Sequence, residues 1–219
     1  MVEQWTENPR VTGSIPVLAT LFRSLPPILK FVVAITGASG APYAKRLLEV
    51  LDRTEHQVDI VTSSHAAEVA EAETGGLAIP ARFKVYGDRT MQVPFVSGSA
   101  LSGPNGYDAL VIIPCSMGTL GRIAHGYSDS TITRAADVFL KEKRKLLIVP
   151  REMPWNLLQA RNIVSLLEAG AVVLPASPSF YGRPQTVLDV VDTVVSRVLD
   201  HLGVEHALVK RWKDEPAGD

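Results

Sequence analysis

The sequence predicts an α/β protein with a doubly wound, mostly parallel sheet between two layers of helices. Short buried apolar runs alternate with amphipathic helical segments along the chain, and glycine, serine and threonine are frequent in the turns between them. Alternation of this kind is typical of right-handed β–α–β crossovers. At 219 residues the chain suits one domain. We expect that domain at residues 31–205, between a poorly ordered N-terminal extension, 1–30, and a C-terminal tail, 206–219.

The first strand, turn and helix occupy residues 31–51. Residues 31–36 form a buried strand, the sequence GASG at 37–40 forms a tight turn, and apolar residues at helical spacing begin at Ala41. Pro42 is tolerated in the first helical turn because its missing N–H needs no partner there. A glycine turn that leads into a helix presents N–H groups to an anion, most often phosphate. The turn lacks the lysine of a P-loop and the middle glycine of a dinucleotide fingerprint. A turn selected only for its backbone angles remains the alternative.

The remaining elements follow from the same two patterns. Apolar runs predict strands at residues 57–62, 82–86, 109–114, 145–150 and 171–175. Helical spacing predicts helices near residues 65–73, 119–124, 130–142, 155–169 and 186–202. Asp129 is the expected N-cap of the helix at 130–142. The segment 91–106, rich in glycine, serine and proline, is expected to be a loop.

Composition excludes several classes of function. The formal net charge of −1 gives no support for a nucleic acid or an anionic membrane as the main partner. No apolar run approaches the roughly 20 residues of a membrane span. The five histidines lack metal-ligand spacing, so we expect no protein-held metal. The single cysteine, Cys115, excludes an internal disulfide and fits a reducing compartment, most simply the cytoplasm. We expect it to be a buried residue rather than a nucleophile.

Hydroxyl-bearing and charged residues follow the predicted strands. In parallel sheets, ligands bind beyond the carboxyl ends of the strands, so these side chains are expected to meet at one edge. Together they suit a phosphate tail and the polar edge of a planar ligand. They are Thr62, Ser63, Ser64, Cys115, Ser116, Met117, Gly118, Thr119, Arg151, Glu152, Ser177, Ser179, Tyr181 and Arg183.

Two groups of charged residues allow opposite interpretations. Arg134 and Lys141 lie seven residues apart, on one helix face and about 10 Å apart along the axis. Ordinary ion pairs with Asp137 are the simpler interpretation from spacing alone. Glu152 follows a buried strand and suits a general acid or base, but an ion pair with the adjacent Arg151 is an equal alternative.

Five longer segments of the chain carry a family resemblance. They are ITGASGAPYAKRLL, PCSMGTLGRIAHGYSDSTITRAADVFLKEKR, VPREMP, AGAVVLPASPSFYGRPQ and VVSRVLDHLGV. On these segments, over about residues 31–212, the chain closely resembles the UbiX-type flavin prenyltransferases. The resemblance implies flavodoxin-like subunits in a homododecamer, with active sites at subunit junctions. It also implies transfer of a dimethylallyl group from dimethylallyl monophosphate to N5 and C6 of reduced FMN, without a metal. The product, prenylated FMN, then serves a UbiD-type decarboxylase.

The same resemblance assigns roles to individual positions. Those that match the family's FMN contacts are Gly37, Ala38, Ser39, Ser63, Ser116, Met117, Gly118, Thr119 and Arg151. Those that match residues around the donor phosphate are Tyr181, Arg197, Arg134 and Lys141. Glu73 and Glu152 match acidic residues linked to proton transfer and leaving-group departure. The resemblance therefore makes Arg134 and Lys141 members of the catalytic set, together with the two glutamates, and reverses the ion-pair interpretation.

One position departs from the family pattern. Met91 stands where many members carry tryptophan, and Phe95 is expected to supply part of the missing wall beside the prenyl group. Two other functions remain alternatives. A flavin-dependent decarboxylase of the phosphopantothenoylcysteine type is disfavoured because PCSMGTL replaces its typical P-x-S-A-N-T segment. A non-enzymatic FMN-binding subunit of a decarboxylase is disfavoured because storage of a flavin needs no second phosphate site.

Overall fold

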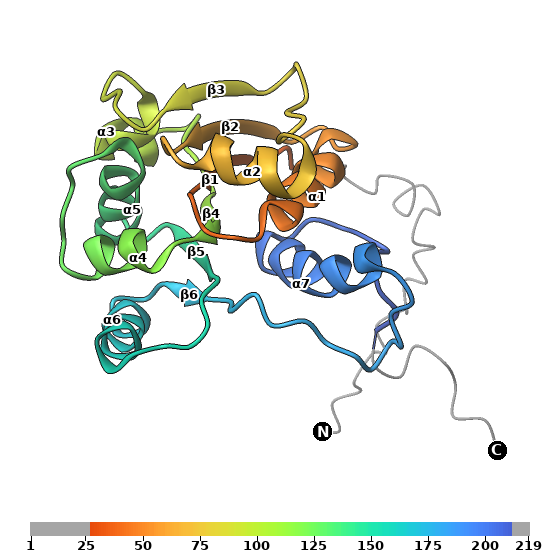
Figure 1. Ribbon diagram of the computed structural model, residues 1–219. Helices are drawn as coiled ribbons and strands as arrows, with labels where there is room; N and C mark the ends of the chain where they lie inside the picture. Colours follow the sequence, from red (N-terminus) through yellow and green to blue (C-terminus); the bar gives the residue numbers. More distant parts are fainter. Residues whose placement is uncertain (1–26, 212–219) are drawn as a thin grey trace, which may run out of the picture.

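The structure of the protein is a computed structural model, which describes residues 27–211 (Figure 1). The predicted N-terminal extension therefore falls outside the described residues except for positions 27–30. The same holds for the part of the predicted C-terminal tail beyond Arg211. The first strand begins at Lys30, one residue earlier than expected.

One sheet of six strands forms the centre of the described region, in the order β3-β2-β1-β4-β5-β6, and each pairing in it is parallel. The sheet is thus wholly parallel where the sequence predicted a mostly parallel one. The chain first builds the sheet outward from β1 through β2 to β3, and then outward on the other side of β1 through β4 and β5 to β6. The strand order therefore reverses between β1 and β4, where doubly wound sheets bind their ligands. The strands are β1 (Lys30–Ile35), β2 (Gln57–Thr62), β3 (Lys84–Gly87), β4 (Ala109–Cys115), β5 (Lys145–Pro150) and β6 (Val172–Val173).

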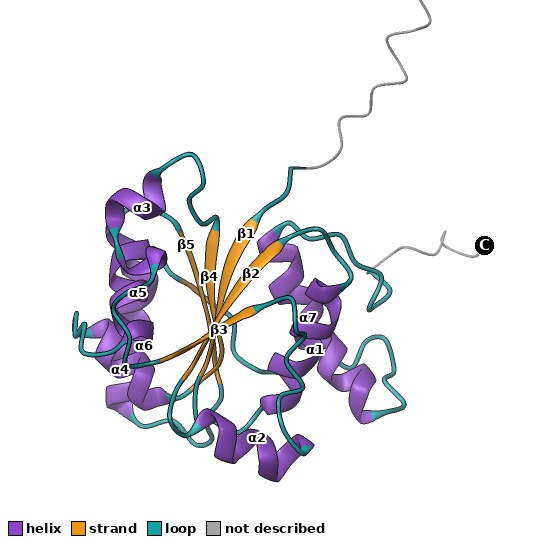
Figure 2. Ribbon diagram, turned by 90° about the horizontal axis from the view of Figure 1, so that it is seen from above, coloured by secondary structure: helices purple, strands orange, loops and turns teal. Residues whose placement is uncertain are grey.

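Helices cover both faces of the sheet, as Figure 2 shows with the sheet seen edge-on. On one side lie α1 and α7, and on the other lie α3, α4, α5 and α6. This is the expected three-layer α/β/α architecture. The helices are α1 (Ala41–Asp52), α2 (Ala66–Thr74), α3 (Gly98–Ser102), α4 (Met117–Ala124), α5 (Thr131–Lys141), α6 (Leu157–Glu168) and α7 (Val187–Leu202), with a short 3-10 helix, η2 (Pro94–Val96).

Two apolar cores flank the sheet because successive strand residues point to opposite faces. In β1, Phe31 and Val33 join the core beneath α1 and α7, whereas Val32 and Ala34 join the core beneath α4 and α5. Strands buried on both faces read as continuous apolar runs, which is why the sequence placed β2 and β5 at their observed bounds.

Of the two helix starts predicted from local signals, one is confirmed and one is wrong. Pro42 lies in the first turn of α1, as predicted. The prediction of Asp129 as the N-cap of α5 is wrong. Ser130 is the cap, and its hydroxyl accepts the backbone N–H of Thr133 in a reciprocal capping box. Asp129 instead accepts from Arg122 and from the hydroxyl of Thr133.

Two other expectations need correction. The segment 91–106 contains η2 and α3 instead of a plain loop, because Phe95, Val96 and Leu101 are buried in the core beneath α5. The last strand, expected at 171–175, is only two residues long. It lies at the sheet edge, where Pro175 has no N–H to continue the ladder. Among residues 27–211, no helix is both long and apolar enough to cross a bilayer.

Candidate functional site

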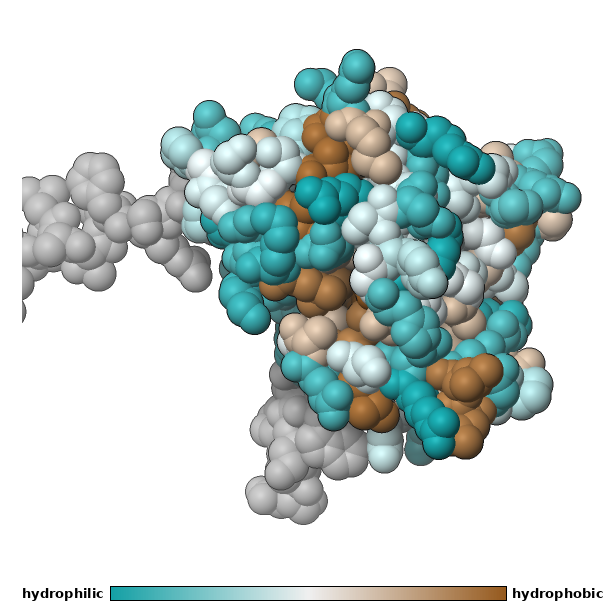
Figure 3. Space-filling model, turned by 90° about the vertical axis from the view of Figure 1, so that its left-hand side faces the viewer, coloured by the Kyte–Doolittle hydropathy of each residue, from teal (hydrophilic) through white to brown (hydrophobic). Residues whose placement is uncertain are grey.

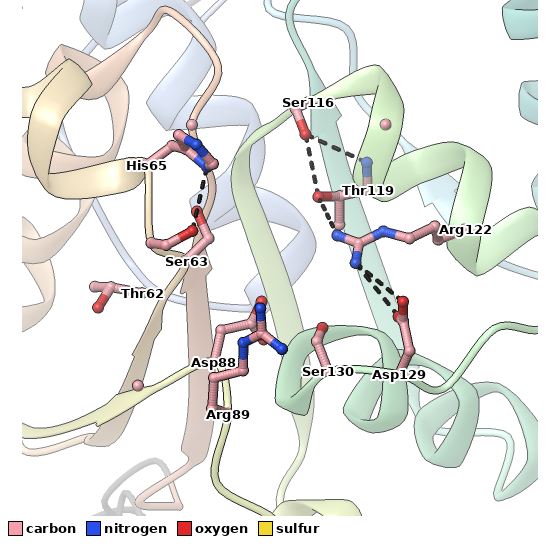
Figure 4. Close-up of a pocket in the computed structure, with 14 residues that line it drawn as sticks. Thr62, Ser63, His65, Asp88, Arg89, Ser116, Thr119, Arg122, Asp129 and Ser130 are labelled. Carbon is pink, nitrogen blue, oxygen red and sulfur yellow. Dashed lines mark hydrogen bonds and ion pairs between the residues drawn. The ribbon is translucent and has the colours of Figure 1, made fainter.

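A pocket of about 780 Å³ opens at the carboxyl ends of the strands, where the turns after β1, β2, β3 and β4 converge (Figure 4). Its volume lies within the range of sites that bind cofactor-sized molecules, about 300–1,000 Å³. The lining consists of glycines and of hydroxyl-bearing and charged side chains. The residues that line it are Gly37, Thr62, Ser63, Ser64, His65, Gly87, Asp88, Arg89, Ser116, Gly118, Thr119, Arg122, Asp129 and Ser130.

The hydroxyl of Thr36 holds the β4–α4 wall of the pocket in place. It donates to the carbonyl of Pro114 at 2.8 Å and accepts the backbone N–H of Ser116 at 2.8 Å. The Ser116 hydroxyl then caps α4 by accepting the N–H of Thr119 at 3.3 Å. The N-terminus of α4 therefore faces the pocket and favours a negatively charged group there.

The β2–α2 turn forms the opposite wall and packs closely on the GASG turn. Ser63 donates its N–H to the carbonyl of Ile35 at 2.9 Å, which ties the two turns together. A Cβ atom added at Gly37 would lie 2.5 Å from the Cβ of His65, closer than any ordinary contact. Glycine is therefore required at 37 for space, and its absent side chain lets the two turns meet.

Substitution of Gly37 by alanine is expected to push the β2–α2 turn outward and to weaken binding of the FMN that the family resemblance implies about tenfold, near 1.4 kcal/mol. The measurement is the dissociation constant for FMN by fluorescence quenching. The matched control is Gly103→Ala, outside the pocket lining, because an added Cβ at Gly103 meets only ordinary contacts, the nearest at 3.5 Å from the carbonyl oxygen of Ser99. Equal affinities of the two variants would contradict the packing argument.

Arginines and a carboxylate form the floor of the pocket. In Figure 4, Arg122 lies between Thr119 and Asp129, and its guanidinium is 3.4 Å from the Thr119 hydroxyl and 3.3 Å from the Asp129 carboxylate. Arg89 comes from the turn after β3 and lies on the side of the pocket nearest Ser130. The floor therefore brings two guanidinium groups to a site whose walls carry hydroxyls.

Asp88 joins the turn after β3 to the start of α5. Its carboxylate accepts the N–H of Ile132 at 2.8 Å, and its carbonyl accepts the N–H of Thr131 at 3.1 Å. Burial raises the pKa of Asp88 above its ordinary value, although hydrogen bonds from Ile132 and Ser130 favour the ionised form. Sequence reasoning did not single out Asp88, Arg89 and Arg122, although Asp88 and Arg89 lie two and three residues after the strand predicted at 82–86.

The anion that the sequence predicted at the N-terminus of α1 is supplied by the protein itself. The Glu73 carboxylate accepts the backbone N–H groups of Gly40 at 2.9 Å and Ala41 at 2.8 Å. Arg151 interacts electrostatically with this carboxylate, and the Ser39 hydroxyl donates to it. The GASG turn thus joins Ser39, Glu73 and Arg151 into one cluster beside the pocket.

The Glu73 cluster predicts a pH-dependent contribution to stability. Partial burial acts to raise the pKa of Glu73, but hydrogen bonds from Ser39, Gly40 and Ala41 hold it below its ordinary value of 4.5. A carboxyl group with a lowered pKa in the folded state contributes stability above its unfolded pKa, and that contribution is lost as the pH falls through the folded value.

We expect Glu73→Gln to lower the free energy of unfolding by about 1 kcal/mol at pH 7, because the carboxylate caps α1 but is partly screened by solvent. The difference from the wild type is expected to vanish when the pH falls below the folded pKa of Glu73. Urea unfolding of both proteins at several pH values measures this difference in the free energy of unfolding. Glu71→Gln, on the same helix, is the matched control for loss of one charge. A difference that persists unchanged at low pH would contradict this role.

The other predicted site residues lie outside this pocket in a single chain. Arg134 is paired with Asp137 at 2.9 Å, as spacing alone predicted, but Lys141 pairs with Glu142 at 2.6 Å rather than with Asp137. Glu152 is exposed and accepts the N–H of Met153 at 3.1 Å. The remaining members are the exposed Tyr181 and Arg197, the exposed Arg151, and the buried Ala38 and Met117 beside the pocket turns.

Cys115 is fully buried at the end of β4, and desolvation raises the pKa of its thiol to about 12. It is therefore an unreactive thiol at neutral pH, as the sequence indicated. Among residues 27–211, no group of three or more His, Cys, Asp or Glu is arranged to hold a metal.

The residues of the pocket fit a flavin mononucleotide. Ser63, Ser116 and Thr119 offer hydrogen bonds to a polyhydroxyl chain, whereas the α4 N-terminus and the two arginines of the floor suit a phosphate. The buried side chains behind the turns keep these donors fixed.

Comparisons with known proteins agree with this chemistry. The model of the Flavoprotein family matches residues 24–199. The flavin prenyltransferase UbiX of Methanocaldococcus jannaschii is 46% identical over 185 residues, which cover 84% of this chain and 98% of the relative. The chain belongs to the UbiX-type flavin prenyltransferases.

Two solved structures of UbiX-like proteins share the fold. A dodecameric FMN-dependent UbiX-like decarboxylase from Escherichia coli O157:H7 is 38% identical, with a TM-score of 0.77 and coverage of 84% of this chain and 100% of that one. AnUbiX (PadA1) in complex with FMN and dimethylallyl pyrophosphate is 34% identical, with a TM-score of 0.79 and coverage of 86% and 100%. The flavodoxin-like expectation is thus confirmed.

Proposed function

We propose that the protein is a flavin prenyltransferase that joins a dimethylallyl group from dimethylallyl monophosphate to N5 and C6 of reduced FMN. The observation that carries this proposal is the hydroxyl-lined pocket at the β1–β4 switch point, in a chain of the UbiX family. Reduced FMN, when bound, supplies the nucleophilic nitrogen. The chain supplies orientation, charge and proton transfer.

The proposed catalytic residues are those that face the departing phosphate. Cleavage of the allylic C–O bond sends the bonding pair to the phosphate oxygen, so negative charge grows there as the bond to nitrogen forms. Arg134, Lys141, Arg197 and Tyr181 are proposed to hold that phosphate, and cationic groups lower the barrier when they face developing negative charge. Glu152 is proposed to exchange a proton with the departing phosphate, and Glu73 to fix the GASG turn beside the flavin.

The placement of α5 and α7 supports sites that are shared between subunits. Phe139 of α5 packs in one core and Val198 of α7 packs in the other, so the two helices lie on opposite faces of the sheet (Figure 2). The sheet therefore separates the helices that carry Lys141 and Arg197 within one chain, which favours a site built from two chains. If both residues hold the donor phosphate, they are expected to come from different chains, as in a homo-oligomer.

Exposed apolar side chains supply surfaces for such an assembly. Met153 is 85% exposed and Leu158 is 69% exposed, beside other apolar residues of α6. Figure 3 shows hydrophobic side chains among polar ones on the side of the molecule that carries α4, α5 and α6. We propose a homododecamer, as in the E. coli relative.

Two further parts of the proposal follow from the family resemblance. Prenylated FMN is proposed to pass to a UbiD-type decarboxylase, which uses it as a cofactor. A cytoplasmic location is proposed because the single, buried Cys115 fits a reducing compartment.

Analysis of the flavin after reaction tests the proposal directly. The protein is incubated anaerobically with reduced FMN and dimethylallyl monophosphate, and the extracted flavin is analysed by mass spectrometry and absorbance. The flavin is expected to gain one dimethylallyl unit. Unchanged FMN, in protein shown to bind it, would contradict the assignment for this donor.

A further inference from the structure

An ion pair joins the end of α5 to the start of α3. The Lys141 ammonium donates to one oxygen of the Glu142 carboxylate at 2.6 Å, and the Ser102 hydroxyl donates to the other oxygen at 2.9 Å. A Cβ atom added at Gly98, the first residue of α3, would overlap Oε1 of Glu142 and lie 2.6 Å from Nζ of Lys141. The pair therefore occupies space that exists because residue 98 has no side chain.

The Glu142 carboxylate lies where it does not favour α5 itself. Glu142 is the C-cap of α5, and the C-terminal end of a helix favours cations such as Lys141 over carboxylates. Hydrogen bonds from Lys141 and then from Ser102 lower the pKa of Glu142 below its ordinary value, so the group is ionised at neutral pH. The carboxylate is thus explained by what it holds and not by the stability of its own helix.

The two helices that hold Glu142 are fixed relative to each other. Leu101 of α3 and Phe139 of α5 are fully buried in the same core, and α3 lies beside α5 in Figure 2. The Lys141 side chain, in contrast, is 48% exposed and ends a flexible stem of four carbons. Glu142 therefore gives the mobile ammonium of Lys141 a fixed partner on a rigid support.

We propose that Glu142 is a positioning residue that directs the Lys141 ammonium toward the donor phosphate, and that Gly98 provides the space in which it does so. This inference rests on the proposed function, in which Lys141 holds the departing phosphate. The ammonium has three N–H donors, so the contact with Glu142 leaves two for the phosphate. A side chain that is fixed beforehand loses less rotamer entropy when it meets the phosphate, so more of its attraction stabilises the transition state.

Removal of the Glu142 charge tests the positioning role in the full-length enzyme. Glu142→Gln keeps the size of the side chain, and it is expected to lower kcat with dimethylallyl monophosphate about tenfold and to leave the KM for reduced FMN unchanged. The control is Glu55→Gln, which removes one carboxylate from an exposed position after α1 and is expected to keep the wild-type rate. An unchanged kcat in Glu142→Gln would overturn the inference. A higher kcat would overturn it as well, because Glu142 would then compete with the phosphate for Lys141.

A double-mutant cycle distinguishes positioning of Lys141 from a general structural effect. In the Lys141→Met protein, Glu142→Gln is expected to change kcat less than about twofold, because the group that it positions is gone. Gly98→Ala displaces the pair without removing a charge, and it is expected to lower kcat about tenfold in the wild type but less than about twofold in Lys141→Met. Gly103→Ala is its control, since the added Cβ meets only ordinary contacts. Tenfold losses that persist in the Lys141→Met protein would overturn the inference.

Chemical labelling of Lys141 separates this inference from the proposed function. The full-length proteins are treated briefly with an acylating reagent, and the acylated fraction of each lysine is determined by mass spectrometry. Release of the ammonium from its carboxylate in Glu142→Gln or Gly98→Ala is expected to raise the labelling rate of Lys141 about threefold, as suits a partly exposed ion pair. The rate at Lys84, exposed on β3, is expected to stay the same. Equal rates at Lys141 in the three proteins would overturn the inference, whereas absence of prenylated flavin in the wild type would contradict only the proposed function.

Discussion

Replacement of Asp192 by alanine is expected to lower the free energy of unfolding by about 3 kcal/mol, the lower end of the range for breaking a buried pair, because it leaves the buried Arg46 guanidinium with only the more exposed Glu49 as a partner. Arg46 of α1 donates to the Asp192 carboxylate of α7 at 2.6 Å and 3.0 Å, in a two-point contact. The two side chains are only 14% and 9% exposed. Urea unfolding of the wild type and of Asp192→Ala measures the difference in the free energy of unfolding.

An exposed ion pair on the same helix provides the control. Asp52 pairs with Arg82 at 2.7 Å, but these side chains are 42% and 39% exposed. Asp52→Ala is therefore expected to cost less than about 1 kcal/mol. The double variant Arg46→Met with Asp192→Leu is expected to recover most of the loss, since an apolar pair of similar volume needs no buried charge. Similar losses for Asp192→Ala and Asp52→Ala would contradict the argument from burial.

Sequence patterns predicted the strands of the sheet well but not this ion pair. A continuous apolar run marks a buried strand, and this pattern lies within the strand's own residues. The bounds of β2 and β5 were therefore predicted without error. Arg46 and Asp192 are 146 positions apart and lie on different helices. Only the packing of α1 against α7 brings them together, and no local pattern contains that information.

Part of the candidate site was likewise predictable from the sequence, and part was not. Gly37, Ser63, Ser116 and Thr119 were predictable because the carboxyl-end rule applies to the turn after each strand. Arg122 escaped prediction because it projects from the second turn of α4, and its place in the pocket depends on Asp129 of a later turn. The anion at α1 was predicted as a ligand, but tertiary structure supplies it from Glu73.

Two inactive variants are expected to restore activity when they are assembled together. Lys141→Met and Arg197→Met each remove a cation from the proposed donor phosphate, and each alone is expected to lower kcat by about 10²–10³-fold. Because α5 and α7 lie on opposite faces of the sheet, the proposed function assigns the two residues at one phosphate to different chains. In a randomly mixed closed oligomer about a quarter of the sites then carry both native residues.

The measurement uses oligomers made by co-expression of the two variants with different affinity tags, purified on both tags in turn. The prenylation rate is expected to reach about a quarter of the wild-type rate. Simple mixing of the two finished oligomers is the control, since it leaves each site as it was assembled. The double variant Lys141→Met/Arg197→Met, co-expressed with the wild type, is expected to keep about a quarter of the sites native as well. Co-expressed single variants that remain as inactive as either alone would show that the two cations act within one chain or at separate phosphates. In that case the exposed apolar surface of α6 could still form a subunit contact, but the active site would lie away from the subunit junction.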